Sequence, residues 1–171
     1  SLEYYKRFPG DRVRFAELVA LAEKGEITTP SGDVVCPSRL RSLGHLLGAS
    51  GGAEKLHYLL EYPHTSRAFR HDLAELLPYG GRNPLYAVIH ESSYADGVVT
   101  NWSAARMLPN DFREDPTLLT GEHVMPEWFD TDQELRPWKE VANLIANHPW
   151  PKLYDPDVLR TAEVPCAAAV Y

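Results

Sequence analysis

The sequence predicts a mainly α-helical domain built from several short helices, with room for one small β-hairpin near residues 26–36. Apolar residues recur at the three- and four-residue spacing of a helix face in one stretch after another. Many of these stretches begin at a capping residue or a proline and end at a glycine. Strands do not alternate with helices, so nothing in the chain would build a parallel sheet. These observations favour a helical bundle or a helical insertion in a larger protein.

The first helix is expected after Asp11, whose carboxylate can cap it, and Gly25 can end it. Its buried face would consist of Phe15, Leu18, Val19 and Ala22. Two short runs with β propensity follow, at residues 27–29 and 33–35, on either side of a Pro-Ser-Gly turn. The hairpin is therefore expected at this point.

Four further helices are expected in the next part of the chain. Pro37 begins the first, the second follows Gly52, Ser66 caps the third, and Asn83 with Pro84 opens the fourth. Their apolar positions, in the same order, are Leu40, Leu43 and Leu47; Ala53, Leu56 and Leu60; Phe69, Leu73, Leu76 and Leu77; and Leu85, Val88 and Ile89.

Residues 97–136 are rich in proline, aspartate and aromatic residues, and we expect mostly loop there, with a short helical turn near residues 103–107. A clear helical pattern then returns. Its apolar positions are Trp138, Val141, Ala142 and Ile145.

The end of the chain contains a short helix and an apolar run. Asp155 and Pro156 are typical of a helix start. The run at residues 164–171 suits a core strand that belongs to something larger, although its alanines suit a helix almost as well. The chain also opens at Ser1 without an initiating Met. We therefore expect it to be a segment of a longer protein.

Composition excludes several classes of protein. With 171 residues, 44% apolar and 24% charged, the chain has the make-up of one globular domain. A formal charge of −7 provides no basic stripe, which argues against a nucleic-acid partner. No stretch approaches the roughly 18 apolar residues that span a bilayer, and no signal peptide is recognisable. We expect a cytoplasmic protein without a membrane partner.

Short motifs for metal binding and nucleophilic catalysis are incomplete. Cys36 and Cys166 lie far apart and form no Cys/His cluster, so we expect neither a metal nor another cofactor. The sequence HESSY, residues 90–94, has Tyr where a zinc protease needs its second His. Residues 48–52 match G-x-S-x-G around Ser50, but a nucleophile elbow needs a strand before it, and here a helix is expected.

Two glutamates have aromatic neighbours in the sequence that suggest a binding site. Glu91 lies in the segment that starts at Pro84, and Glu122 precedes an aromatic-rich stretch. Each could be an ordinary solvated acid. Two carboxylates beside aromatic rings can also form a receptor for an organic ammonium, through charge-assisted hydrogen bonds and cation–π attraction. A positively charged peptide N-terminus would fit such a receptor.

Seven collinear stretches carry a resemblance to a known family. They are LHYLLE (56–61), NPLYAVIHESSY (83–94), WSA (102–104), LTGEH (119–123), LRP (135–137), WPKLYDP (150–156) and EVP (163–165). With these stretches the chain resembles the proline iminopeptidases (prolyl aminopeptidases) of the α/β-hydrolase superfamily, especially their actinobacterial-type branch. The resemblance covers nearly the whole chain.

The resemblance implies that the chain is the helical cap, or lid, of such an enzyme. Residues 1–163 would form the cap domain, and residues 164–171 would start the return into a hydrolase core that the chain lacks. The Ser, Asp and His of the triad would lie outside the chain, so no catalytic residue is assigned and the isolated chain is expected to be inactive. The partners implied are a peptide with N-terminal proline and the hydrolase core.

The resemblance also implies which residues bind the substrate. Glu91 and Glu122 would hold the free imino group of the N-terminal proline, and His123 would orient the loop beside Glu122. The aromatic candidates for lining the pocket are Tyr94, Trp102, Trp128 and Phe129. The spacing at Glu122 differs from that of better-known family members.

Two other interpretations stay open on the sequence. The chain could be a free-standing helical binding module, or, ranked last, a complete small hydrolase that uses Ser50. If the chain is a cap, its exposed underside is apolar, and a homodimer through that face is expected to be accessible.

Overall fold

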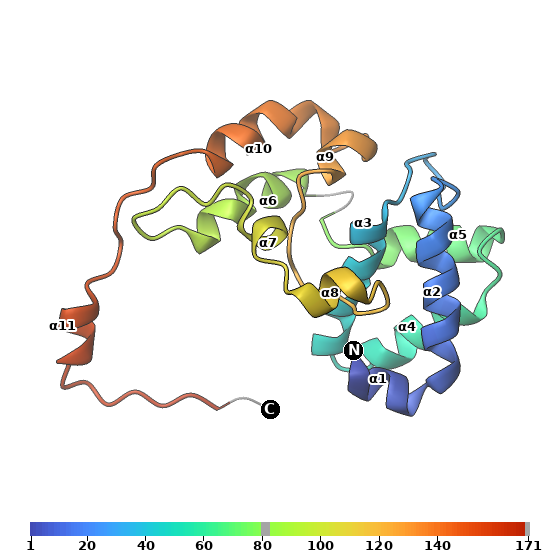
Figure 1. The fold of residues 1–171 in the computed structure, drawn as a ribbon, viewed down its shortest axis with the longest axis horizontal. Helices are drawn as coiled ribbons and strands as arrows, with labels where there is room; N and C mark the ends of the chain where they lie inside the picture. Colours follow the sequence, from blue (N-terminus) through green and yellow to red (C-terminus); the bar gives the residue numbers. More distant parts are fainter. Residues whose placement is uncertain (80–82, 170–171) are drawn as a thin grey trace.

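The computed structural model describes residues 1–79 and 83–169, and this part of the chain is helical almost throughout, as predicted (Figure 1). Two groups of helices lie side by side, each around its own apolar cluster. The first half of the chain supplies most of one group, and later segments supply the other. A tail follows the second group. No helix in the described residues is long and apolar enough to cross a membrane.

The first group of helices encloses the larger cluster. Its elements are α1 (Leu2–Arg7), α2 (Pro9–Glu23), α3 (Pro37–Arg41), the 3₁₀ helix η1 (Ser42–Gly48), α4 (Gly52–Glu61) and α5 (Arg67–Leu76). Phe15, Leu40, Leu43, Leu56 and Leu73 are completely buried at its centre. These residues come from the apolar stripes that the sequence predicts. The predicted caps hold in part, since the Ser66 hydroxyl accepts a hydrogen bond from the amide of Phe69.

Two expectations in this group need correction. Helix α2 begins at Pro9, so Asp11 lies inside the first turn and does not cap it. The Asp11 carboxylate is instead buried, where it accepts hydrogen bonds from the Tyr4 hydroxyl and from Nδ1 of His57, 2.9 Å away. The predicted hairpin is reduced to one antiparallel bridge between Thr28 and Val34, because α2 ends at Glu23 and α3 begins at Pro37, which leaves few residues for a longer ladder.

The second group contains shorter elements joined by loops. They are α6 (Pro84–Ile89), the 3₁₀ helix η2 (His90–Tyr94), α7 (Ser103–Arg106), α8 (Asn110–Glu114), α9 (Trp128–Thr131), the 3₁₀ helix η3 (Arg136–Trp138) and α10 (Lys139–Ala146). Trp128, Phe129, Leu135 and Ala142 are completely buried in its cluster. The expected loop character of residues 97–136 is confirmed, with the helical turn at α7 inside it.

Helices α6 and α10 pack on each other through small side chains. Ala142 and Ala146 of α10 are buried, whereas Val141 of its predicted stripe is 43% exposed. On α6 the buried side chains are Ala87 and Val88, so of the predicted stripe only Val88 reaches the interior. The remaining apolar side chains of α6, Leu85 and Ile89, are about half exposed. This pair of helices therefore presents apolar surface to the outside.

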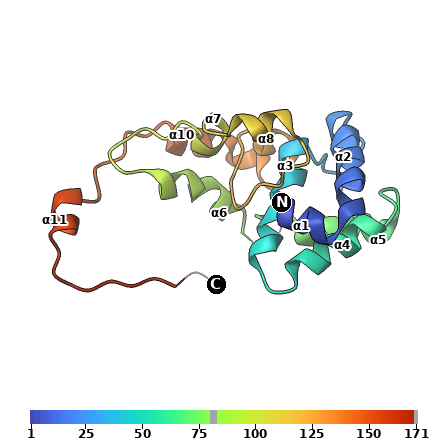
Figure 2. The same ribbon diagram turned by 60° about the horizontal axis from the view of Figure 1, so that its bottom comes forward.

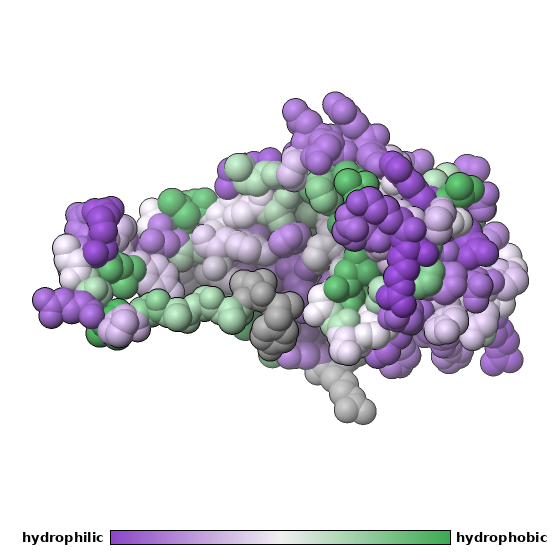
Figure 3. Space-filling view, turned by 90° about the horizontal axis from the view of Figure 1, so that it is seen from below, coloured by the Kyte–Doolittle hydropathy of each residue, from purple (hydrophilic) through white to green (hydrophobic). Residues whose placement is uncertain are grey.

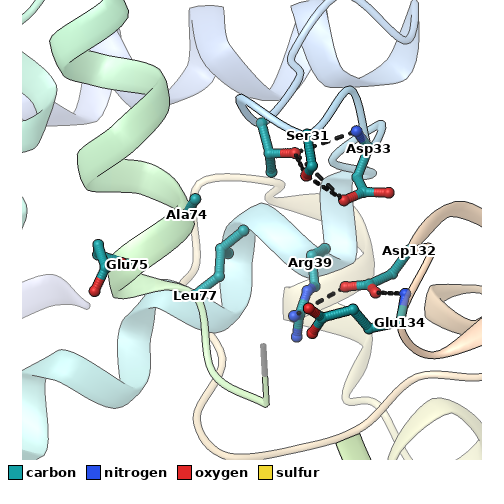
Figure 4. Close-up of a pocket in the computed structure, with 9 residues that line it drawn as sticks. Ser31, Asp33, Arg39, Ala74, Glu75, Leu77, Asp132 and Glu134 are labelled. Carbon is teal, nitrogen blue, oxygen red and sulfur yellow. Dashed lines mark hydrogen bonds and ion pairs between the residues drawn. The ribbon is translucent and has the colours of Figure 1, made fainter. Parts of the chain in front are cut away.

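A group of polar contacts fastens the loop before α3 to the turn after α9. The amide of Gln133 donates to Asp33, and its side chain donates to the carbonyl of Ser31. Arg39 extends toward Asp132 beneath this loop, beside a hollow of about 210 Å³ (Figure 4). The guanidinium also lies over the Trp128 ring, 4.6 Å from its centroid. Arg39 therefore joins the two groups of helices.

Gly44 marks another close contact between distant segments, and a substitution tests it. A Cβ atom at Gly44 would lie 2.2 Å from the carbonyl oxygen of Thr120, whereas one at Gly48 of the same 3₁₀ helix would meet nothing within 4 Å. We expect Gly44→Ala to lower the free energy of unfolding by about 2 kcal/mol, since the backbone must shift. Gly48→Ala is the matched control. Equal urea midpoints for the two variants would contradict this contact.

The C-terminal part leaves the body of the molecule. After α10 the chain runs to α11 (Pro156–Arg160), which Asp155 caps as predicted, and then turns back in extended form (Figures 1 and 2). Seen from below, a narrow stretch of mostly hydrophobic surface extends away from the body of the molecule (Figure 3). Val164 itself is 74% exposed. The described part of the predicted apolar run thus forms neither a strand nor a helix here.

Candidate functional site

Glu91 is a buried carboxylate with one oxygen left unpaired. It lies in η2, directly after α6, and only 1% of its surface is exposed. Its Oε2 accepts a hydrogen bond from the amide of Ser103, 3.1 Å away. Its Oε1 is buried as well and has no hydrogen-bond partner in the described part of the chain. Such an atom is costly, because burial removes its water without replacing the lost hydrogen bonds.

The backbone beside Glu91 is strained. Asn101 and Trp102 both have positive φ values, 47° and 57°, which residues with a Cβ rarely adopt. This pair immediately precedes Ser103, so the unusual turn sets the direction of the amide that meets Glu91. Strained backbone of this kind is concentrated at functional sites.

A chain of hydrogen bonds connects η2 to the loop that carries Glu122. Nε2 of His90 lies 2.8 Å from the carbonyl oxygen of Glu122 and 2.9 Å from the hydroxyl of Tyr94. The Tyr94 hydroxyl in turn lies 3.1 Å from Nδ1 of His123. On the other side, the Tyr79 hydroxyl is 3.4 Å from Nδ1 of His90. The predicted residues Tyr94, Glu122 and His123 are thus brought together.

Two hollows lie on either side of this loop. Tyr94 and His123 line a mostly apolar groove of about 280 Å³, together with Ser103, Ala104, Met107, Leu108 and Pro109. Glu122 lines the other hollow, of about 590 Å³, together with Gly44, His45, Gly48, Ala49 and Gly121. Because Ser103 also contacts Glu91, the first groove lies next to the buried carboxylate. The second exposes Glu122 to solvent.

The two glutamates act electrostatically on the same phenol. Burial raises the pKa of Tyr94, and the negative charges of Glu91 and Glu122 raise it further. Burial likewise raises the pKa of Tyr79, and the negative charge of Glu122 raises it further. Tyr94 and Tyr79 therefore stay protonated and able to donate, between carboxylates that create a negative potential. A cation is the ligand that this potential favours.

The three other aromatic candidates take different positions. Trp102 is half-buried; its ring packs against Phe129 at 5.7 Å between centroids, and its indole donates to Asn143. Trp128 and Phe129 have no exposed surface at all. Their rings support the site from beneath and form none of its open surface. Of the four aromatic candidates, Tyr94 thus lines the groove, Trp102 is half-buried beside the site, and Trp128 and Phe129 belong to the core.

Sequence reasoning missed His90 and the backbone contribution of Ser103. His90 opens the HESSY stretch, in which the sequence excludes a zinc site and indicates Glu91 and Tyr94 as site residues, but no role is predicted for His90 itself. Its importance depends on a contact with the carbonyl of Glu122, 32 positions along the chain, which no local pattern signals. The short element η2 places His90 and Tyr94 one turn apart, and this spacing was the available clue.

The described residues contain no group of three or more His, Cys, Asp or Glu side chains placed to hold a metal ion. Ser50 is exposed in the turn between η1 and α4, so a 3₁₀ helix, and no strand, precedes it. That context is wrong for a nucleophile elbow. The G-x-S-x-G match therefore carries no catalytic assignment.

Comparison with known proteins identifies two relatives of the chain. No protein-family model matches it. A proline iminopeptidase of Aeromonas sobria is 33% identical over 98% of this chain and 42% of its own length. The proline iminopeptidase aneH of Aspergillus aculeatus is 26% identical over 97% of this chain and 40% of its own. The chain thus spans about two-fifths of these relatives. By sequence, the chain is similar to this part of the proline iminopeptidases.

Proposed function

We propose that this chain is the substrate-selecting cap of a serine aminopeptidase that releases N-terminal proline from peptides. The observation that carries the proposal is the unpaired Oε1 of Glu91, buried beside a strained turn. A protonated imino nitrogen would supply the missing partner. The names of the relatives and the helical fold of the matching two-fifths support the same proposal.

The cap would act by fixing the substrate's positive end. Glu91 would bind the imino nitrogen through a charge-assisted hydrogen bond, which contributes about 1.5–3 kcal/mol. Glu122 would add attraction from across Tyr94, more weakly because it is exposed. The apolar groove beside Ser103 would receive the proline ring. A blocked N-terminus, or an N-terminus farther along the peptide, could not satisfy Glu91.

Catalysis itself would occur in the part of the protein that this chain does not match. There a serine hydroxyl would attack the carbonyl carbon of the first residue while a histidine removes the proton of the hydroxyl. The shortened peptide would leave with that proton, and water would release proline from the acyl-enzyme. The cap's contribution is orientation, since a fixed imino group holds one scissile bond over the nucleophile.

The division of the chain follows from this role. Residues 1–163 would form the cap, and residues 164–171 would lead back into the hydrolase core. The exposed apolar side chains of Leu85 and Ile89 and the detached run after α11 are surfaces that such a core would cover.

A comparison of two proteins and two substrates tests the proposal. We expect the full-length protein to hydrolyse prolyl 2-naphthylamide, and the 171-residue chain to release no naphthylamine. Acetylation of the proline nitrogen removes its charge and is expected to lower kcat/KM by at least about a hundredfold. Turnover by the 171-residue chain would contradict the cap role. Equal rates on the acetylated substrate would contradict the imino site.

A further inference from the structure

The hydrogen bonds beside Glu91 limit which ring nitrogens of His90 and His123 carry a hydrogen. The carbonyl oxygen of Glu122 can only accept, so Nε2 of His90 carries a hydrogen. Nδ1 of a neutral His90 then accepts, and the Tyr79 hydroxyl stands at 3.4 Å to donate to it. His90 therefore donates from Nε2 and accepts at Nδ1.

The same logic continues to His123. The Tyr94 hydroxyl faces the N–H of His90 on one side, so its single hydrogen is free to point to Nδ1 of His123 on the other. When Tyr94 donates in this way, Nδ1 of His123 is the acceptor, and a neutral His123 carries its hydrogen on Nε2. Burial and the nearby His90 lower the pKa of His123, although Glu122 acts in the opposite direction. The lowered pKa favours the neutral ring.

In this tautomer Nε2 of the exposed His123 ring, which lines the apolar groove, is an N–H donor. No hydrogen bond within residues 1–79 and 83–169 uses Nε2 of His123, and the ring lines the groove together with Tyr94 and Ser103. The acceptor that fits is a neutral carbonyl oxygen. A carboxylate would meet the negative potential of Glu91 and Glu122.

We propose that the Nε2–H of His123 holds the carbonyl oxygen of the substrate's second residue, so that the cap prefers peptides to simple prolyl amides. The inference rests on the proposed function. With the imino nitrogen at Glu91, the first carbonyl belongs to the scissile bond and must remain with the catalytic groups. The carbonyl of the second residue is the next acceptor along the peptide and the first that the cap can bind.

Two substrates distinguish loss of the hydrogen bond from His123 from a general disturbance of the site. Prolyl-alanine amide has a carbonyl in its second residue, and prolyl 2-naphthylamide has none. In the full-length protein we expect His123→Asn and His123→Phe to lower kcat/KM about tenfold for prolyl-alanine amide, the value of one hydrogen bond. On the naphthylamide, which has no such carbonyl, both variants should lose less, so that the preference for prolyl-alanine amide over the naphthylamide falls by about threefold or more.

A third variant supplies the matched control. The side-chain nitrogen of Gln reaches the place of Nε2, whereas that of Asn reaches only the place of Nδ1. His123→Gln is therefore expected to keep most of the activity on prolyl-alanine amide. Melting temperatures of the variants identify any general loss of folding.

The outcomes are distinct. Equal losses on both substrates, or a Gln variant as poor as the Asn variant, would overturn the assignment of His123 while leaving the imino site in place. A wild-type protein that cleaves neither substrate would overturn the proposed function, and this inference with it.

Discussion

Glu91→Gln is expected to lower kcat/KM of the full-length protein for prolyl 2-naphthylamide about a hundredfold, or about 2.7 kcal/mol. Gln keeps the shape and the acceptor for the Ser103 amide, but it removes the negative charge that would meet the imino nitrogen. Glu122→Gln should cost less, about tenfold, because Glu122 is exposed. Glu140→Gln, at an exposed position of α10, is the control and should change nothing.

The same substitution is expected to have the opposite effect on stability. A buried, unpaired carboxylate oxygen costs free energy in the unliganded chain, and a neutral amide costs less. Glu91→Gln should therefore raise the free energy of unfolding by about 1 kcal/mol in urea titrations of the 171-residue chain. Loss of activity together with loss of stability would indicate that Glu91 is retained for structure and would contradict a binding role.

The helices were predictable wherever local signals and tertiary packing agree. Ser66 caps α5 because its hydroxyl reaches an amide three residues on, which the sequence alone encodes. Helix α6 was predicted as an element, but its buried face was not. Its inward side chains are Ala87 and Val88, because α10 approaches through the small Ala142. Periodicity identifies a helix but not the neighbour against which it packs.

The site was predictable to a similar extent. The residue types around Glu91 and Glu122 suggested a receptor for a cation, and the resemblance to a family implied which ligand the two carboxylates would hold. The role of His90 was not accessible, because it depends on a backbone carbonyl from a distant loop. Asp11 shows the same limit in the core, since His57, 46 positions away, converts a presumed cap into a buried acceptor.

Arg39→Ala is expected to lower the free energy of unfolding by about 3 kcal/mol. Only 4% of Arg39 is exposed, its guanidinium stacks on Trp128, and Nη2 lies 3.4 Å from Asp132. Burial lowers the pKa of Arg39, against the opposing charge of Asp132. Truncation would leave a cavity beside Trp128 and remove a contact that joins the two groups of helices.

Two further arginine variants decide what Arg39 contributes. Arg39→Lys keeps the charge but not the planar stacking on Trp128, and should cost about 1.5 kcal/mol. Arg160→Ala removes an arginine that is 72% exposed and paired only within α11, and should cost less than about 0.5 kcal/mol. Urea unfolding followed by tryptophan fluorescence measures all three. If Arg39→Ala unfolds at the same urea concentration as Arg160→Ala, the two groups of helices are held together by their apolar contacts and not by this buried cation.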